Sequence, residues 1–176
     1  MNSASNKSFT YHDIFTILVV DDSSFVFKAI SSLPLRYKTK LEFAKNGSEA
    51  LMKYSHNVEQ GILYHLVLMD LQMPIMDGFE TARHIREEEQ KKQYPHTFIS
   101  AMSAFEESGN ICCSFLLIFF DNFLCLLNDF VDAGNRAKRE GMNNFCQKPM
   151  RLEILNNLIK QRCEEIGIPL PEQVNQ

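Results

Sequence analysis

The strongest structural signal in the chain is Leu66-Val67-Leu68-Met69-Asp70-Leu71-Gln72-Met73-Pro74-Ile75-Met76-Asp77-Gly78-Phe79. Its first four residues are apolar, which is typical of a strand that is buried on both faces. Pro74 and Gly78 predict a turn after that strand. Asp70 therefore falls at the carboxyl end of a buried strand, and ligands bind along that edge in open α/β sheets.

Apolar runs and helical patterns alternate along the rest of the chain. Strands are predicted over residues 15–20, 41–44, 66–70, 97–102 and 144–147. Helices are predicted from Phe25 to about Leu33, from the turn at 46–49 to about residue 56, from Gly78 to about Gln93, and from Met150 to about Glu165. Because this alternation is typical of crossovers between parallel strands, we expect an α/β fold, a doubly wound five-stranded parallel sheet with helices on both faces.

The residues that follow the predicted strands are Asp21, Asp22, Asp70, Ser103 and Lys148. Taken singly, such residues are more often helix caps or loop residues, but their joint occurrence at the strand ends favours a site. Three clustered carboxylates repel one another unless a cation lies among them, and oxygen ligands suit Mg²⁺. The amine and the hydroxyl indicate an anionic ligand as well, and an Asp can attack phosphorus to form an aspartyl phosphate.

The chain has 176 residues and a formal net charge of −4, which suits one domain and indicates neither nucleic acid nor an anionic membrane as a partner. The polar segment Met1–His12 lacks the apolar core of a secretory signal. We therefore expect a cytoplasmic protein with a flexible N-terminal tail over residues 1–14, a domain over 15–166 and a C-terminal tail over 167–176. The five cysteines form no CxxC pair, which favours reduced thiols over a zinc site.

Together these motifs resemble the receiver domain of two-component response regulators, which has a flavodoxin-like fold. The matching residues are Asp21-Asp22, Asp70 within the segment 69–78, Ser103-Ala104, and Lys148-Pro149. Residues 44–51 are also similar to the turn after the family's second strand. The resemblance covers residues 16–162 with one interruption, and it implies a module of a His-Asp phosphorelay.

The resemblance implies that Asp70 is the phosphoacceptor. It would take a phosphoryl group from a phosphohistidine on a histidine kinase or a His-containing phosphotransfer protein. The same resemblance implies that Asp21, Asp22, Asp70 and the backbone carbonyl of Gln72 hold Mg²⁺.

The resemblance also implies how the domain responds to the phosphoryl group. Ser103 would bond to the group, Lys148 would pair with it, and the small side chain of Ala104 would leave room for it. Phe145 matches the family's switch aromatic, which turns inward on activation. The family often has a cis peptide before the proline that follows the lysine, so Pro149 is a cis candidate.

The chain departs from the family between the fourth and fifth predicted strands. The excess, residues 111–135, begins with a Phe- and Leu-rich apolar run that ends at Val131. A transmembrane helix is disfavoured because Asp121 and Asp129 would be costly inside a membrane. It would also put two strands of one sheet on opposite sides of the bilayer. Two interpretations of the segment stay open: an amphipathic insertion that packs on the domain or a partner, and a segment that is not native, such as a translated intron.

Other classes of function fit the sequence less well. A phosphatase with an Asp nucleophile usually carries a second acid two residues later, but Leu71 and Gln72 follow Asp70. Neither Gly-rich nucleotide-binding motif occurs. The alternative left open is a degenerate receiver that acts only by binding. We therefore expect a phosphoacceptor with weak self-dephosphorylation and no kinase core, either alone or as part of a hybrid kinase.

Overall fold

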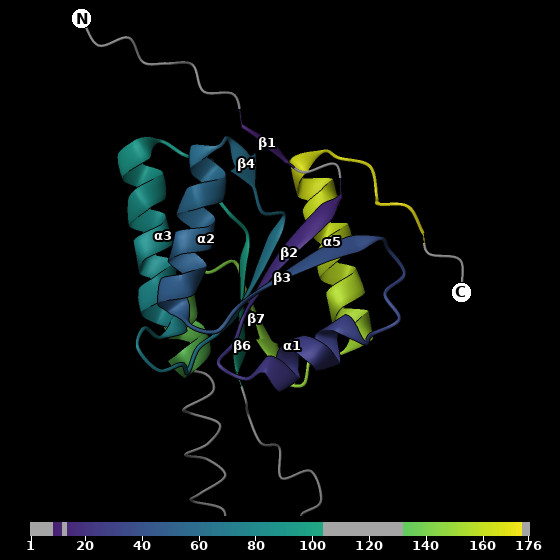
Figure 1. Cartoon of the computed structure of the whole chain (residues 1–176), viewed down its shortest axis with the longest axis horizontal. Coiled ribbons are helices and arrows are strands. Elements are labelled where there is room, and N and C mark those ends of the chain that lie inside the picture. Colours follow the sequence, from purple (N-terminus) through teal and green to yellow (C-terminus); the bar gives the residue numbers. More distant parts are fainter. Residues whose placement is uncertain (1–8, 12–13, 104–131, 174–176) are drawn as a thin grey trace, which may run out of the picture.

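The computed structural model describes residues 9–11, 14–103 and 132–173. Its main feature is a five-stranded parallel sheet with the order β3-β2-β5-β6-β7 (Figure 1). The strands are β2 (Phe15–Val20), β3 (Thr39–Ala44), β5 (Leu66–Asp70), β6 (Ile99–Ser103) and β7 (Asn144–Gln147). The predicted doubly wound sheet is confirmed, and its central strand β5 carries Asp70 at its carboxyl end.

Helices cover both faces of this sheet. They are α1 (Ser24–Ser31), α2 (Gly47–Glu59), α3 (Gly78–Lys92) and α5 (Leu152–Ile166), and residues 132–139 are also helical. Figure 1 shows α2 and α3 on one side of the sheet and α1 and α5 on the other. Each side has its own apolar core, with Tyr54 and Ile85 in one and Ile30 and Leu155 in the other.

Three helices begin at polar caps that follow the strand ends. Ser23 Oγ accepts a hydrogen bond from the Phe25 amide at 3.3 Å, which starts α1. Asn46 Oδ1 accepts from the Glu49 amide at 2.9 Å, and Asp77 Oδ1 accepts from the Glu80 amide at 2.7 Å. Because these side chains satisfy amides that have no partner inside a helix, they fix where α1, α2 and α3 begin.

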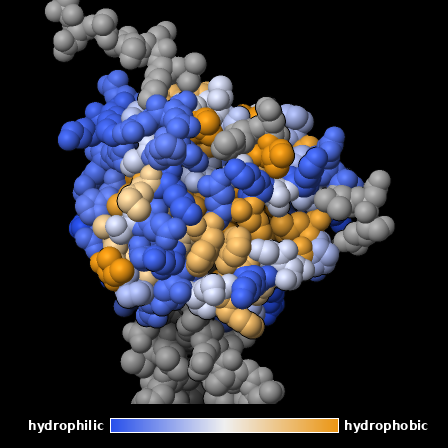
Figure 2. Space-filling view, viewed as in Figure 1, coloured by the Kyte–Doolittle hydropathy of each residue, from blue (hydrophilic) through white to orange (hydrophobic). Residues whose placement is uncertain are grey.

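The outer side of α3 is charged. Figure 2 shows mostly hydrophilic residues over α3 in this view. Lys92 Nζ lies 2.6 Å from Glu88 Oε1 one turn away, and Arg83 Nε lies 3.8 Å from Glu87 Oε1. Such exposed pairs add only tenths of a kcal/mol each, about 0.3–0.5, so this helix is held mainly by its apolar side.

The expectation of a flexible tail over residues 1–14 is wrong at Thr10–Tyr11. These two residues form β1, which pairs in parallel with the two-residue strand β4 (Ile62–Leu63). Two contacts hold this short strand in place. The Phe9 and Tyr94 rings lie 5.3 Å apart, and the Tyr11 hydroxyl accepts a hydrogen bond from Arg162 Nη2 at 2.9 Å.

Two strands, β6 and β3, have boundaries that differ from the prediction. β6 begins at Ile99 rather than at the predicted Thr97. The reason is that the Thr97 amide donates to the Glu89 carboxylate at 2.8 Å instead of to a neighbouring strand. β6 also ends one residue later than predicted, at Ser103. β3 begins two residues earlier than predicted, at Thr39.

The chain after α5 is also tied to the domain. The Lys38 amide donates to the Glu172 carbonyl at 2.9 Å, and Tyr37 and Gln173 form an antiparallel bridge. The segment therefore returns along the connection between α1 and β3.

The expected insertion between the fourth and fifth strands of the main sheet falls between β6 and β7, and its residues 111–131 lie outside the described part of the chain. Its last residues, 132–135, are helical, and Ala133 packs against the same core as Ala137. Among the described residues, none of the helices has both the length and the apolar character needed to span a bilayer.

Candidate functional site

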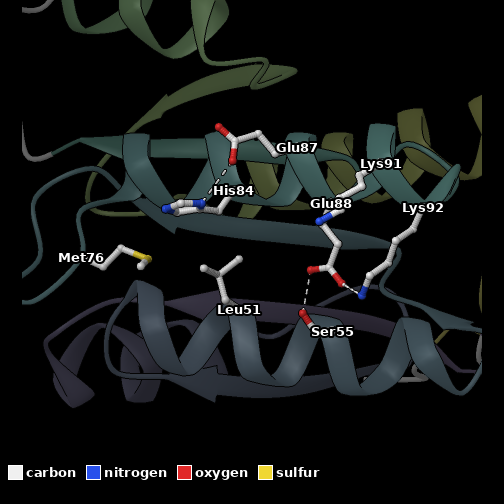
Figure 3. A pocket seen from close by; sticks show the side chains of 8 residues that line it. All are labelled: Leu51, Ser55, Met76, His84, Glu87, Glu88, Lys91 and Lys92. Carbon is white, nitrogen blue, oxygen red and sulfur yellow. Dashed lines mark hydrogen bonds and ion pairs between the residues drawn. The ribbon is translucent and has the colours of Figure 1, made fainter.

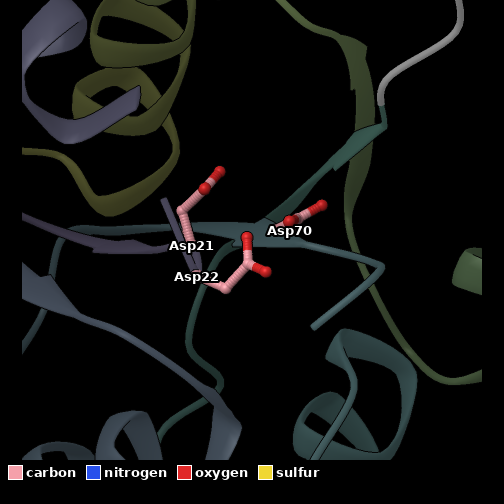
Figure 4. A group of neighbouring side chains, drawn as sticks. All are labelled: Asp21, Asp22 and Asp70. Carbon is pink, nitrogen blue, oxygen red and sulfur yellow. The ribbon is translucent and has the colours of Figure 1, made fainter. Parts of the chain in front are cut away.

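Asp70 lies at the centre of the carboxyl edge of the sheet. It is the last residue of β5, the strand that lies between β2 and β6, and it is only 4% exposed. Asp21 follows β2 on the neighbouring strand and is fully buried, while Asp22 is exposed. Figure 4 shows these three carboxylates grouped at the ends of β2 and β5. The parallel register therefore brings together three of the five residues that the sequence placed at strand ends.

Lys148 follows the edge strand β7 and completes the cluster. Its ammonium lies 2.7 Å from Asp21 Oδ2 and 2.9 Å from Asp70 Oδ2. Its backbone is held at the edge because its amide donates to the Ser103 carbonyl at 2.8 Å. The peptide bond to Pro149 is cis, the form that the family resemblance allowed.

The site is electrostatically tight because its charges are buried together. Burial raises the pKa of Asp70 above its ordinary value, and the ammonium of Lys148 opposes this shift only in part. Burial alone would lower the pKa of Lys148, but the carboxylates of Asp21 and Asp70 outweigh it and raise that pKa above its ordinary value. Lys148 is therefore a permanent cation at neutral pH, placed against a pair of buried carboxylates.

The carboxylates fit an oxygen-liganded divalent cation. One oxygen from each of Asp21, Asp22 and Asp70 can be chosen so that all three lie within 4.8 Å of one another. In an octahedral Mg²⁺ site, ligand oxygens on opposite sides of the ion are about 4.2 Å apart, so only small shifts are needed. The donor set is also chemically right, because it is hard, anionic and free of nitrogen and sulfur.

The loop after β5 lies directly against the Asp70 side chain. The Gln72 amide lies 3.3 Å from Asp70 Oδ1 and donates a hydrogen bond to it. The Ser23 amide donates to Asp21 Oδ1 at 2.9 Å in the same way. Each buried carboxylate is thus held by the amide two residues further along its own chain, which fixes the direction of its oxygens.

Two further predicted site residues, Ser103 and Phe145, lie on the neighbouring strands β6 and β7. Ser103 pairs with Gln147 at the ends of β6 and β7 and is half-buried. Phe145 lies on β7 and packs partly buried against the core under α2 and α3. Ala104 lies outside the described residues.

Sequence reasoning missed one residue that shapes the site. A Cβ added at Gly78 would overlap the carbonyl oxygen of Asp70 and lie 2.9 Å from its carbonyl carbon. The first turn of α3 therefore sits directly on the backbone of Asp70, which only a glycine permits. The signal available in the sequence was the Asp77-Gly78 pair, which is equally typical of an ordinary turn and cap.

Comparison with known proteins agrees with this geometry. The family profile described as "Response regulator receiver domain" matches residues 17–112, more than half of the chain. The chain therefore belongs to the response regulator receiver domain family. The match ends just inside the apolar segment 111–135, and β7 and Lys148 lie beyond it.

The chain is similar to small parts of much larger proteins. It is 30% identical over 145 residues to hybrid signal transduction histidine kinase L of Dictyostelium discoideum, a match that covers 82% of this chain and 7% of that protein. It is 36% identical over 70 residues to response regulator SSK1 of Verticillium dahliae, covering 40% of this chain and 8% of that protein. The chain thus spans less than a tenth of the length of each of these two relatives.

Solved structures share the fold. The receiver domain of Ssk1 from Saccharomyces cerevisiae, crystallised with the histidine phosphotransfer protein Ypd1, superposes with a TM-score of 0.61 at 23% identity. That match covers 86% of this chain and 91% of the other. A receiver domain protein from Clostridium thermocellum gives a TM-score of 0.60 at 19% identity, covering 88% and 98%.

Proposed function

We propose that this chain is a phosphoacceptor receiver of a His-Asp phosphorelay. Asp70 attacks the phosphorus of a phosphohistidine carried by a histidine kinase or a His-containing phosphotransfer protein. A P–O bond to the carboxylate forms as the P–N bond breaks, and the leaving imidazole takes up a proton. The product is an acyl phosphate on Asp70.

The observation that carries this proposal is the position of the Lys148 ammonium, 2.9 Å from Asp70 Oδ2. A nucleophile that accepts a phosphoryl group gains negative charge around it, and a fixed cation beside it stabilises that charge without reorganising. Lys148 is also close to Asp21, so it is held in place before any phosphoryl group arrives. Positioning and charge stabilisation account for most of the catalysis in phosphoryl transfer.

We propose that Asp21, Asp22, Asp70 and the Gln72 carbonyl hold Mg²⁺. When bound, the ion would neutralise charge on the phosphoryl oxygens. The burial of Asp21 and Asp70 supports this assignment. Their two negative charges face the single positive charge of Lys148, so a further cation would balance the charge of the site.

We propose that phosphorylation changes the surface through Ser103, Phe145 and Lys148. Ser103 would donate its hydroxyl to the phosphoryl group, and Lys148 would shift from the two carboxylates toward it. Phe145 has no hydroxyl, so its response is read by packing alone. Its partly buried position against the core supports a role as a movable side chain.

The proposed module is a switch rather than a metabolic enzyme. The Ssk1 receiver was crystallised with a histidine phosphotransfer protein, and we propose a partner of the same kind for this chain. We also assign it to the cytoplasm, in keeping with the free thiols of Cys146 and Cys163.

The proposal is tested by incubating the purified chain with acetyl phosphate and measuring its intact mass by mass spectrometry. With Mg²⁺ we expect a gain of one phosphoryl group, and with EDTA in place of Mg²⁺ we expect none. The matched control is Asp22→Asn, which keeps the nucleophile and should slow the gain without abolishing it. A gain that does not depend on Mg²⁺, or no gain at all in the wild-type chain, would refute the proposal.

A further inference from the structure

The loop over residues 71–77 joins β5 to α3 and carries Gln72, whose carbonyl belongs to the proposed metal site. Glycines hold both ends of this loop. At its start, the Gly78 amide donates to the Leu71 carbonyl at 3.3 Å. At its end, the Gly47 amide donates to the Met76 carbonyl at 3.3 Å. Gly47 belongs to α2, so a different helix supports the end of the loop.

The loop needs this support because part of it is strained. Ile75 has a φ of 74°, in the left-handed region that a β-branched residue seldom adopts. Its side chain is 83% exposed, so its own packing does little to hold that conformation. A strained residue persists when its surroundings determine its backbone, and the contacts of Met76 next to it are the nearest ones.

Gly47 is packed so closely that no side chain fits. A Cβ there would overlap Thr81 Oγ1 and would lie 2.8 Å from Met76 Cγ and 2.9 Å from the Met76 carbonyl oxygen. These neighbours differ in their freedom to move. Figure 3 shows Met76 at one end of the groove between α2 and α3, beside Leu51 and His84, so its side chain has open space beside it.

The other two neighbours have no such space. Thr81 is fully buried, and its hydroxyl donates to the Asp77 carbonyl at 2.6 Å. The Met76 carbonyl is backbone and moves only with the loop itself. A larger residue at position 47 therefore pushes on the packing of α3 through Thr81 and on the loop through Met76.

We propose that Gly47 is a positioning residue for the phosphoacceptor site. Its contact with the Met76 carbonyl sets the conformation of residues 71–77, and with it the place of Gln72, whose amide donates to Asp70 Oδ1 at 3.3 Å. This inference rests on the proposed function, because it assigns Gly47 a part in holding the same metal site. Gly47 touches neither the metal nor the phosphoryl group, and it acts through the loop.

The two effects of a side chain at position 47 can be separated by a second substitution. In the variant G47A/T81A, the overlap with the Thr81 hydroxyl is removed, whereas the close contact with the Met76 carbonyl remains. We expect this variant to unfold cooperatively in urea but to bind Mg²⁺ about 10- to 100-fold more weakly than T81A alone, measured by calorimetry. The matched control S48A changes the exposed neighbouring residue and should bind Mg²⁺ like the wild type.

A second measurement uses the unmodified chain and avoids any folding defect. Because coupling between two sites is reciprocal, Mg²⁺ at the site should strengthen the contact between Gly47 and Met76. We expect hydrogen exchange of the Gly47 amide to slow by about tenfold or more when Mg²⁺ is near a hundred times its Kd. The Gly61 amide, which donates to Val58 at the other end of α2, should not respond.

The outcomes are distinct. If the wild-type chain binds Mg²⁺ and gains a phosphoryl group, but G47A/T81A binds Mg²⁺ like T81A, then the role of Gly47 is refuted and the proposed function stands. Hydrogen exchange of the Gly47 amide at the same rate with and without Mg²⁺ would also refute the role of Gly47. If the wild-type chain neither binds Mg²⁺ nor gains a phosphoryl group, the proposed function fails, and the role of Gly47 fails with it.

Discussion

The ammonium of Lys148 lies 2.9 Å from Asp70 Oδ2, although the two residues are far apart in the sequence. Asp70 ends β5 and Lys148 follows β7, and these two strands are not neighbours in the sheet. β6 lies between their strands, and the backbone bond from Lys148 to Ser103 at the end of β6 places the side chain where it can reach across. The cation is thus fixed by the sheet register rather than by local structure.

Replacing Lys148 removes the only cation near two buried carboxylates in the described part of the chain. We expect Lys148→Met to lower the free energy of unfolding by about 3–5 kcal/mol, because Asp21 and Asp70 are left without a counter-charge. MgCl₂ should restore more stability to this variant than to the wild type. The measurement is urea unfolding at pH 7. Lys160→Met, on the exposed face of α5, is the control and should change stability by less than about 0.5 kcal/mol.

Replacing Asp70 should stabilise the fold at neutral pH. The pKa of Asp70 is higher in the folded chain than in the unfolded chain, so the folded state holds its proton more tightly. As the pH rises above the unfolded value of about 3.9, the unfolded chain loses its proton first and stability falls. We expect Asp70→Asn to remove this loss, so its advantage over the wild type grows from pH 4 to pH 7 without Mg²⁺. Equal stability of the two chains at both pH values would contradict this account.

The contact between α3 and the backbone of Asp70 can be tested by adding one methyl group. We expect Gly78→Ala to lower stability by about 1–3 kcal/mol and to slow phosphorylation, because the new Cβ overlaps the Asp70 carbonyl. Gly134→Ala is the matched control in the helical residues 132–139, where the nearest atom would be 3.9 Å away. There the substitution should stabilise by about 0.5–1 kcal/mol. Thermal unfolding of the two variants decides between these directions.

The strain at Ile75 predicts an unusual gain from a glycine. Both Ile75→Gly and Ile75→Ala remove the same exposed side chain, but only glycine accepts a φ of 74° without strain. We expect the glycine variant to be about 1 kcal/mol more stable than the alanine variant, measured by urea unfolding. If alanine is the more stable of the two, the backbone at this position is not strained in solution.

The main sheet and its carboxyl edge were predictable because they depend on local signals. The apolar residues Leu66 to Met69 are all fully buried, and the strand ends place Asp21 and Asp70 where parallel pairing must bring them together. The strand Thr10–Tyr11 was not predictable, because two residues show no periodicity and their partner strand is equally short. Its order comes from Tyr94 and Arg162, which are distant in the sequence.

The supporting contacts of the site were also beyond sequence reasoning. Asn46-Gly47 indicates a turn, and that turn does begin α2. How closely Gly47 approaches Thr81 and Met76 depends on the packing of α2 against α3, which no pattern within either segment encodes. Lys148 itself was predicted, because it follows the strand expected over residues 144–147. Its contacts with both Asp21 and Asp70 depend on the order of strands in the sheet, which the sequence pattern does not encode.

The most direct test of the central claim is to locate the phosphoryl group. The chain is phosphorylated with acetyl phosphate and Mg²⁺, reduced with borohydride, which converts an aspartyl phosphate to homoserine, and mapped by peptide mass spectrometry. We predict homoserine at position 70 and unmodified Asp21 and Asp22. Homoserine at Asp21 or Asp22 instead, or a phosphoryl group that resists borohydride on a serine, would contradict the assignment of Asp70 as the phosphoacceptor.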